Sequence, residues 1–100
     1  MPDVRLLMGG EVIAELTDVR PDMPWFAAQF VPTEGFSRVE PMFRQERELA
    51  ESRDFDAGAW QSIWERIWAE GVTLALADGT RIKRDFAVHV YDDGTARFRY

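Results

Sequence analysis

The chain has 100 residues, of which 12 are Lys or Arg and 18 are Asp or Glu, so its formal net charge is −6. This length predicts one domain over residues 1–100, with enough apolar surface for one modest core. Cysteine is absent and only one histidine is present. These counts exclude disulfides, thiol nucleophiles, Cys-ligated metal sites and the HExxH zinc motif. We therefore expect neither a metal nor a cofactor.

The acidic balance argues against general nucleic-acid binding, which depends on positive charge. The longest apolar stretches, such as residues 72–77, are far shorter than the roughly 20 residues of a membrane span. An acid, Asp3, stands where a signal peptide carries its basic residues. We therefore expect a cytoplasmic protein with no nucleic-acid and no membrane partner.

Gly9-Gly10 predicts the turn of an N-terminal hairpin, because glycine adopts the positive φ that tight turns require. The register that keeps apolar residues on one face sets Leu6 opposite Val12 and Val4 opposite Ala14. The other face then carries Arg5, Leu7, Glu11, Ile13 and Glu15.

A third strand is expected over residues 25–31. It lies between Pro24 and Pro32, neither of which can donate a hydrogen bond to a ladder. A helix that begins at Asp22, with Pro24 in its first turn, is the alternative for this segment.

Residues 57–70 have the pattern of an amphipathic helix. Asp56 is a suitable N-cap, and Gly71 suits the left-handed position beyond the C-terminus. The apolar face recurs at i, i+3, i+4, i+7 and i+8: Trp60, Ile63, Trp64, Ile67 and Trp68. We expect the tryptophans in the core, with only Trp60 or Trp68 at its rim keeping an indole N–H toward solvent. The alternative is that the three tryptophans line a ligand cleft or a partner groove.

Residues 41–52 predict a second helix, with Pro41 at its first position, where a missing amide costs nothing. The apolar stripe is thin: Phe43, Arg47 and Ala50. Alternating charges on the rest of this segment predict a solvated face: Arg44, Glu46, Arg47, Glu48, Glu51 and Arg53.

From Val72 onward the hydrophobic period changes from 3.6 to 2, which predicts strands. Three-residue loops that close at Gly79 and Gly94 keep apolar residues on one face, so both glycines should have positive φ. The expected pairs are Leu74 with Ile82, Leu76 with Thr80, Val88 with Phe98, and Val90 with Ala96.

These elements assemble into a two-layer α+β domain in the order βββ-αα-βββ. We expect an antiparallel sheet of five to six strands with both helices packed on one face.

The chain contains, in this order, a series of aromatic and proline-containing motifs: Met23-Pro24-Trp25, Phe30, Phe36, Pro41-Met42-Phe43, the tryptophan helix and the Asp-Gly hairpin. Together they resemble small bacterial α+β proteins of unknown function. The resemblance covers nearly the whole chain. It implies the fold class, but no activity and no site residue.

The face of the C-terminal strands opposite the core is locally basic. Its candidate interaction residues are Arg81, Lys83, His89, Tyr91, Arg97 and Arg99. Arginine forks match phosphates and carboxylates, so this face could dock an anion or an acidic partner. The alternative is a solvated face whose cations pair with Asp85, Glu11 and Glu15.

His89 has an ordinary pKa near neutrality, but the sequence places no nucleophile beside it. The serines, Ser37, Ser52 and Ser62, fall in or near the helical region and outside a GxSxG context. We therefore predict no catalytic residue.

The function expected first is a non-enzymatic protein-interaction or binding module, with a partner protein or a second copy on the outer sheet face. Trp25 and Phe26 form a secondary candidate patch. The alternative is a small ligand-binding domain or enzyme with a pocket between sheet and helices. Its polar groups would be Arg81, His89, Tyr91 and Arg97.

Overall fold

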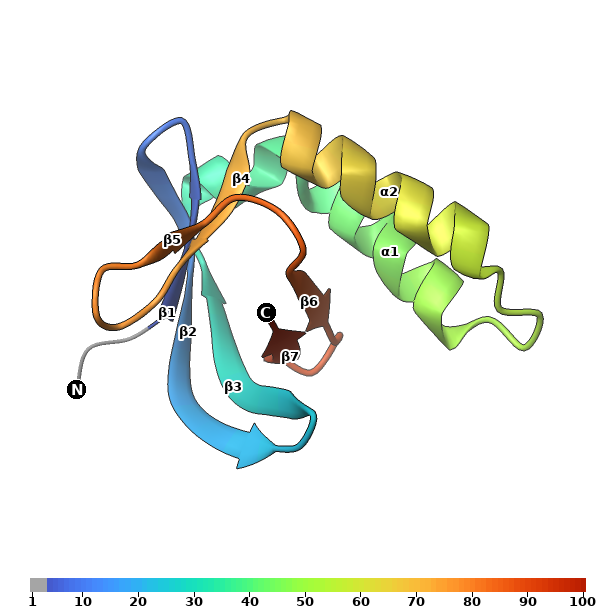
Figure 1. The fold of residues 1–100 in the computed structure, drawn as a ribbon, viewed down its shortest axis with the longest axis horizontal. Coiled ribbons are helices and arrows are strands. Elements are labelled where there is room, and N and C mark those ends of the chain that lie inside the picture. The colour runs from blue at the N-terminus through green and yellow to red at the C-terminus, as the bar shows by residue number, and fades with distance from the viewer. Residues whose placement is uncertain (1–3) are drawn as a thin grey trace.

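A computed structural model describes residues 4–100, which form an antiparallel sheet and two packed α-helices (Figure 1). The strands are β1 (Val4–Met8), β2 (Glu11–Asp22), β3 (Trp25–Pro32), β4 (Val72–Ala75), β5 (Arg81–Ile82), β6 (Ala87–Val90) and β7 (Thr95–Arg99). The helices are the 3-10 helix η1 (Glu34–Arg38), α1 (Glu40–Glu51) and α2 (Ala57–Ala69). Within the described residues no helix has both the length and the apolar character needed to cross a membrane.

The seven strands lie in the order β5-β4-β1-β2-β3-β7-β6, so β5 and β6 are the two edges. Only residues 83–86 connect these edges along the chain, and the sheet therefore curls on itself (Figure 1). The expected antiparallel α+β architecture is confirmed, but the count of five to six strands is too low. One expected strand divides into β5 and β6, because Asp85 between them has φ 63° and interrupts the extended backbone.

The expected register of the N-terminal hairpin is wrong. Leu6 lies opposite Ala14, and Val4 lies opposite Leu16. A bulge between Leu6 and Leu7 shifts the pairing. Such a bulge changes which side chains face the core, and both Ile13 and Ala14 are fully buried as a result.

Strand β3 confirms the extended prediction, and the alternative helix beginning at Asp22 is wrong. β2 continues through Asp22 and pairs with β3 along most of its length. A second irregularity, between Thr17 and Arg20, contains Asp18 at φ 51°. On its other side β3 pairs with β7, where Phe26 lies opposite Phe98.

The tryptophan helix matches its prediction at both ends. The Asp56 carboxylate accepts a hydrogen bond from the Ala59 amide at 3.1 Å, and Gly71 has φ 91°. α1 starts one residue earlier than expected, at Glu40. The two helices pack against each other and lie together on one side of the curled sheet (Figure 1).

Both C-terminal hairpins have the expected registers. Val90 pairs with Ala96, Val88 with Phe98, and Leu74 with Ile82, while the Leu76 amide donates to the Thr80 carbonyl. Gly79 and Gly94 have φ of 92° and 85°. Turn chemistry and alternation together therefore define these hairpins locally.

Trp64 is the largest fully buried side chain, with 1% of its surface exposed. Phe43 and Phe86 contact it edge to face, at centroid distances of 5.7 and 5.8 Å. At the rim, the Trp60 indole N–H is bound by Glu46 rather than by solvent, and the Trp68 N–H is buried without a partner. The helix is thus anchored to the core through its middle tryptophan.

Trp64→Ala should lower the free energy of unfolding by about 3–5 kcal/mol, because it removes a large ring and leaves a cavity. A domain of this size has about 5–15 kcal/mol in total, so the variant should be marginally stable. Calorimetry or thermal circular dichroism measures the change, with exposed Gln61→Ala on the same helix as control. Equal melting temperatures for the two variants would contradict this description of the core.

Candidate functional site

The six residues of the predicted basic face do not share one surface. His89, Arg97 and Arg99 lie on β6 and β7 at one edge of the sheet, and Tyr91 follows β6. Arg81 lies on β5 at the other edge, where it lines a separate depression with Arg5 and Leu7. Lys83 lies in the connection between the two edges. The prediction of one continuous stripe is therefore wrong, because the single strand that was expected to carry Arg81, Lys83 and His89 is interrupted at Asp85, and its two parts, β5 and β6, lie at opposite edges of the sheet.

His89 was expected on a solvated face, but only 8% of it is exposed. α1 packs against β6, and all four residues of this strand are buried. Arg47 of α1 donates to the Val90 carbonyl at 3.2 Å and pairs with Asp92 at 3.0 Å. The helix thus covers an edge strand that would otherwise present unpaired backbone groups.

Two carboxylates flank the His89 ring. Its Nδ1 lies 3.1 Å from Oε1 of Glu46, and its Nε2 lies 3.3 Å from Oε1 of Glu51. Ionised carboxylates only accept hydrogen bonds, so both ring nitrogens must carry protons to satisfy this geometry. The arrangement therefore favours an imidazolium.

The hydrogen bond to Glu46 is the main reason that the pKa of His89 lies above its ordinary value of 6.5. Burial acts in the opposite direction, since it penalises the charged ring, and the negative charges of Glu46 and Glu51 add to the upward shift. His89 therefore carries its charge at higher pH than a free histidine does.

Glu46 was expected on the solvated face of its helix, but it is 1% exposed. Its second oxygen, Oε2, accepts a hydrogen bond from the Trp60 indole nitrogen at 2.8 Å. α1, α2 and β6 therefore meet at one buried carboxylate. Burial is tolerated because both oxygens have donors and the charge faces a cation.

An open groove of about 620 Å³ lies beside this cluster, between the helices and strands β3, β6 and β7. Trp25, the first residue of β3, lines it, whereas its neighbour Phe26 stacks on Phe98 at 5.4 Å. The predicted Trp25 and Phe26 patch is thus divided, because successive strand residues point to opposite faces. The groove lining consists of Trp25, Glu46, Ala50, Glu51, Phe55, Ala57, Trp60, Gln61, His89, Tyr91, Arg97 and Arg99.

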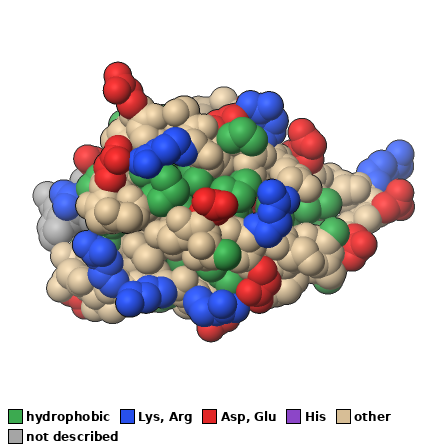
Figure 2. Space-filling view, turned by 90° about the horizontal axis from the view of Figure 1, so that it is seen from above, with side chains coloured by type: hydrophobic (Ala, Val, Ile, Leu, Met, Phe, Trp, Pro, Cys, Tyr) green, Lys and Arg blue, Asp and Glu red, His purple; other side chains and the backbone are tan. Residues whose placement is uncertain are grey.

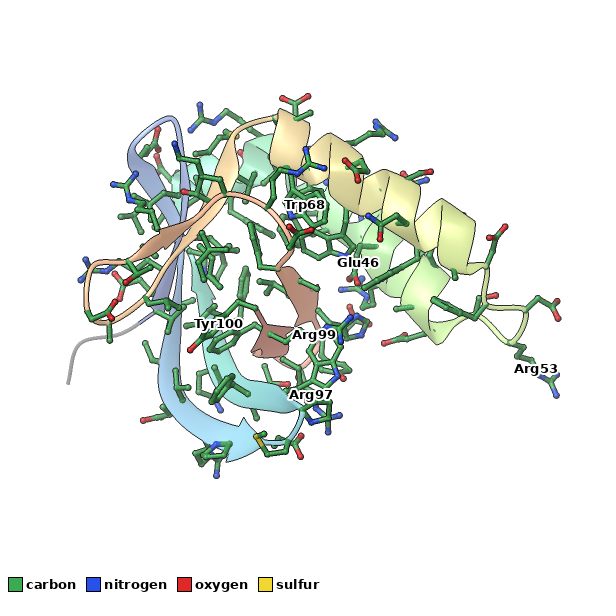
Figure 3. All side chains as sticks on the ribbon, in the orientation of Figure 1. Glu46, Arg53, Trp68, Arg97, Arg99 and Tyr100 are labelled. Atoms are coloured by element: carbon green, nitrogen blue, oxygen red, sulfur yellow. The ribbon has the colours of Figure 1, made fainter. Side chains whose placement is uncertain are left out.

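Arg97 and Arg99 of β7 and Glu46 of α1, which are labelled in Figure 3, all line the groove. Arg97 forms an ion pair with Asp22 at 3.2 Å. Arg99 lies over the Trp25 ring, 5.1 Å from its centroid, and has no carboxylate within 4.0 Å among residues 4–100. Arg99 is therefore the cation of the groove with no acidic partner in that part of the chain.

Charge on the face of the molecule that Figure 2 shows is dispersed. Figure 2 shows basic, acidic and hydrophobic side chains interspersed over one face of the molecule, without a field of one sign. The groove lining contains His89 and two arginines together with the carboxylates of Glu46 and Glu51, and only His89 is paired with these two carboxylates.

Aromatic, aliphatic and charged side chains line the groove. Its lining contains no Ser, Thr, Cys or Lys side chain. With both nitrogens donating, the His89 ring has no lone pair with which to act as a base. Among residues 4–100, no three His, Asp or Glu side chains are arranged to hold a metal ion.

Comparison with protein-family models, with curated proteins and with solved structures finds no match. The interpretation of the groove therefore comes from its own residues and geometry.

Sequence reasoning missed Glu46 and Glu51 as partners of His89, and it missed Trp60 as the second partner of Glu46. One signal was present for Glu46, since it lies three residues after Phe43 and thus on the same helical face. A carboxylate on an apolar face needs a buried partner. His89 is the one imidazole in the chain and was the natural candidate.

The His89 cluster predicts that stability falls as pH rises. A folded-state pKa above 6.5 stabilises the protein fully below about pH 6.5, and this contribution is lost as pH rises through the folded value. Each unit of elevation corresponds to about 1.4 kcal/mol. Urea unfolding of the wild type from pH 5.5 to 9 should show this decline, and His89→Gln should flatten it. An equal decline in both proteins would assign the pH dependence to other groups.

Proposed function

We propose that this protein is a non-enzymatic binding module that holds a small organic anion with a flat apolar body in the groove. The observation that carries the proposal is the convergence of aromatic rings and cations on one hollow. Trp25 and Trp60 provide apolar walls, while Arg99 provides donors, and Arg99 and the protonated His89 provide positive charge. Few polar groups on an apolar lining are typical of sites that orient a small ligand.

The size of the groove supports this class of ligand. Sites for small molecules occupy about 300–1,000 Å³, and this groove holds about 620 Å³. Its walls come from both layers of the fold, since His89 and Arg99 lie on strands and Glu46 and Trp60 on helices. Hydrogen bonds among these residues hold the walls in place before any ligand binds.

The dye 8-anilinonaphthalene-1-sulfonate combines an aromatic body with a single negative charge and is a suitable probe. Its fluorescence should rise with saturable 1:1 binding to the wild type. Trp25→Ala and Arg99→Gln should each raise the dissociation constant about tenfold, the equivalent of 1.4 kcal/mol.

The matched control is Arg81→Gln, which removes the same charge at the other edge of the sheet. It should leave dye binding unchanged within about twofold. Equal affinities for Arg99→Gln and Arg81→Gln would show that the dye does not use the groove, and would refute the proposal.

Docking of a partner protein, or of a second copy, is a second candidate function for the same residues. The exposure of Phe55, 50% open to solvent in the groove wall, favours it. Trp, Tyr and Arg, which also line the groove, are the residue types that contribute most to protein interfaces. If a protein docks here, Arg97 and Arg99 would attract an acidic surface of that partner.

Self-association of this kind should weaken with salt, because exposed charges are screened beyond about 10 Å at 0.1 M. Sedimentation velocity at low and high salt, on the wild type and on Arg97→Glu/Arg99→Glu, measures it. This function is supported if the wild type forms dimers only at low salt and the variant forms none. A monomer under every condition would rule out the self-associating form.

A further inference from the structure

We propose that Glu51 occupies the place of a ligand's own carboxylate, and that a small aromatic carboxylic acid binds by replacing Glu51 as the acceptor of the His89 Nε2 hydrogen bond. This inference rests on the proposed function and adds to it the chemical class of the ligand. It also assigns a separate role to each carboxylate that contacts the imidazole.

The two carboxylates differ in how firmly they are held. Glu46 is buried, lies 3.1 Å from Nδ1 of His89, and is also bound by Trp60 at 2.8 Å. Its removal would leave the imidazolium and the indole N–H without an acceptor. Glu46 is thus a permanent part of the wall.

Glu51 is held in place less firmly than Glu46. Its side chain is 54% exposed, and its hydrogen bond to Nε2 is 3.3 Å long, slightly longer than is usual for such a bond. It is also the last residue of α1. A negative charge there faces the negative end of the helix dipole, which disfavours it. Glu51 is therefore the carboxylate that a ligand can replace, because its rotation into water opens the Nε2 donor while Glu46 stays in place.

The exchange conserves charge. A monovalent carboxylate leaves the imidazolium and another takes its place, so His89 remains protonated and paired throughout, and no covalent bond changes. Burial makes an unpaired Nε2–H unfavourable, which selects an anion over a neutral group at this position. Arg99, which has no acidic partner among the described residues, adds a second positive charge on the groove wall.

The remainder of the ligand meets an apolar surface. Trp25, Phe55 and Trp60 line the groove that contains His89 and Glu51. Aromatic rings pack favourably against one another beyond the area that they bury. An aromatic acid therefore satisfies the charged end and the apolar wall together.

Indole-3-acetate and indole-3-acetamide are twin probes that differ only in the carboxylate. Each is titrated into the protein near pH 6.5 and followed by ¹⁵N spectra of the imidazole, whose signals belong to His89 alone because the chain has one histidine. The acid should bind at least about tenfold more tightly than the amide. Its binding should shift the Nε2 resonance and leave Nδ1 nearly unchanged.

Glu51→Gln directly tests whether Glu51 competes with the ligand's carboxylate, because it removes the negative charge of Glu51 and keeps the shape of the side chain. The variant should bind indole-3-acetate about fivefold more tightly than the wild type. Glu48→Gln is the matched control, since it makes the same change of charge on an exposed position of α1 outside the groove. Its affinity should stay within about twofold of the wild type.

The outcomes separate the two proposals. Equal binding of acid and amide, or equal effects of Glu51→Gln and Glu48→Gln, would overturn the exchange of carboxylates while leaving the groove as a binding site. A shift of Nδ1 rather than Nε2 would overturn it as well. If neither indole compound binds to the wild type or to Glu51→Gln, this inference fails. The proposed function fails as well only if Arg99→Gln and Arg81→Gln also bind the dye with equal affinity.

Discussion

The buried contact between Glu46 and His89 determines how the helical and sheet layers meet. Glu46 comes from α1 and His89 from β6, and the two atoms in contact lie 3.1 Å apart in a region that water barely reaches. A buried charge without a partner costs several kcal/mol, so any other position of α1 along β6 would be strongly penalised. Trp60 extends the same constraint to α2 through its hydrogen bond to Glu46.

Such a pair is not primarily a source of stability. Desolvation of two charges offsets most of their attraction, and well-packed apolar side chains often serve as well. The pair instead specifies one arrangement of α1 at the edge of a curled sheet. Once α1 lies there, its last turn and the start of α2 face β7 and the first residue of β3, and the groove forms between them. The groove is thus a consequence of how α1 covers the edge strand β6.

Local rules were sufficient for a large part of the fold. The turn glycines, alternation and capping residues predict both C-terminal hairpins and α2, because each depends on residues close together in sequence. The order of the hairpins in the sheet could not be predicted in this way. β7 pairs with β3, which lies in the other half of the chain. The loop at Asp85 separates β5 and β6, which the alternating pattern predicts as one strand. The N-terminal register failed because a bulge is invisible to a count of alternating residues.

The sequence predicted only part of the site, because some of its residues come together only in the tertiary fold. His89, Tyr91, Arg97 and Arg99 were identified because they alternate along one hairpin. Glu46 and Glu51 reach His89 from a helix about 40 positions earlier in the chain. A charged residue on a helix is usually solvated, and only the tertiary fold shows which one is enclosed.

A double-mutant cycle at Glu46 and His89 measures the central contact most directly. The free energies of unfolding of the wild type, Glu46→Gln, His89→Gln and the double variant are compared at pH 6, where His89 is protonated in the folded protein. The account predicts a coupling energy of about 1–3 kcal/mol, because each single variant leaves the other group buried with a poorer partner. Single effects that add to within about 0.5 kcal/mol would contradict it, and would show that the position of α1 on β6 is determined by packing alone.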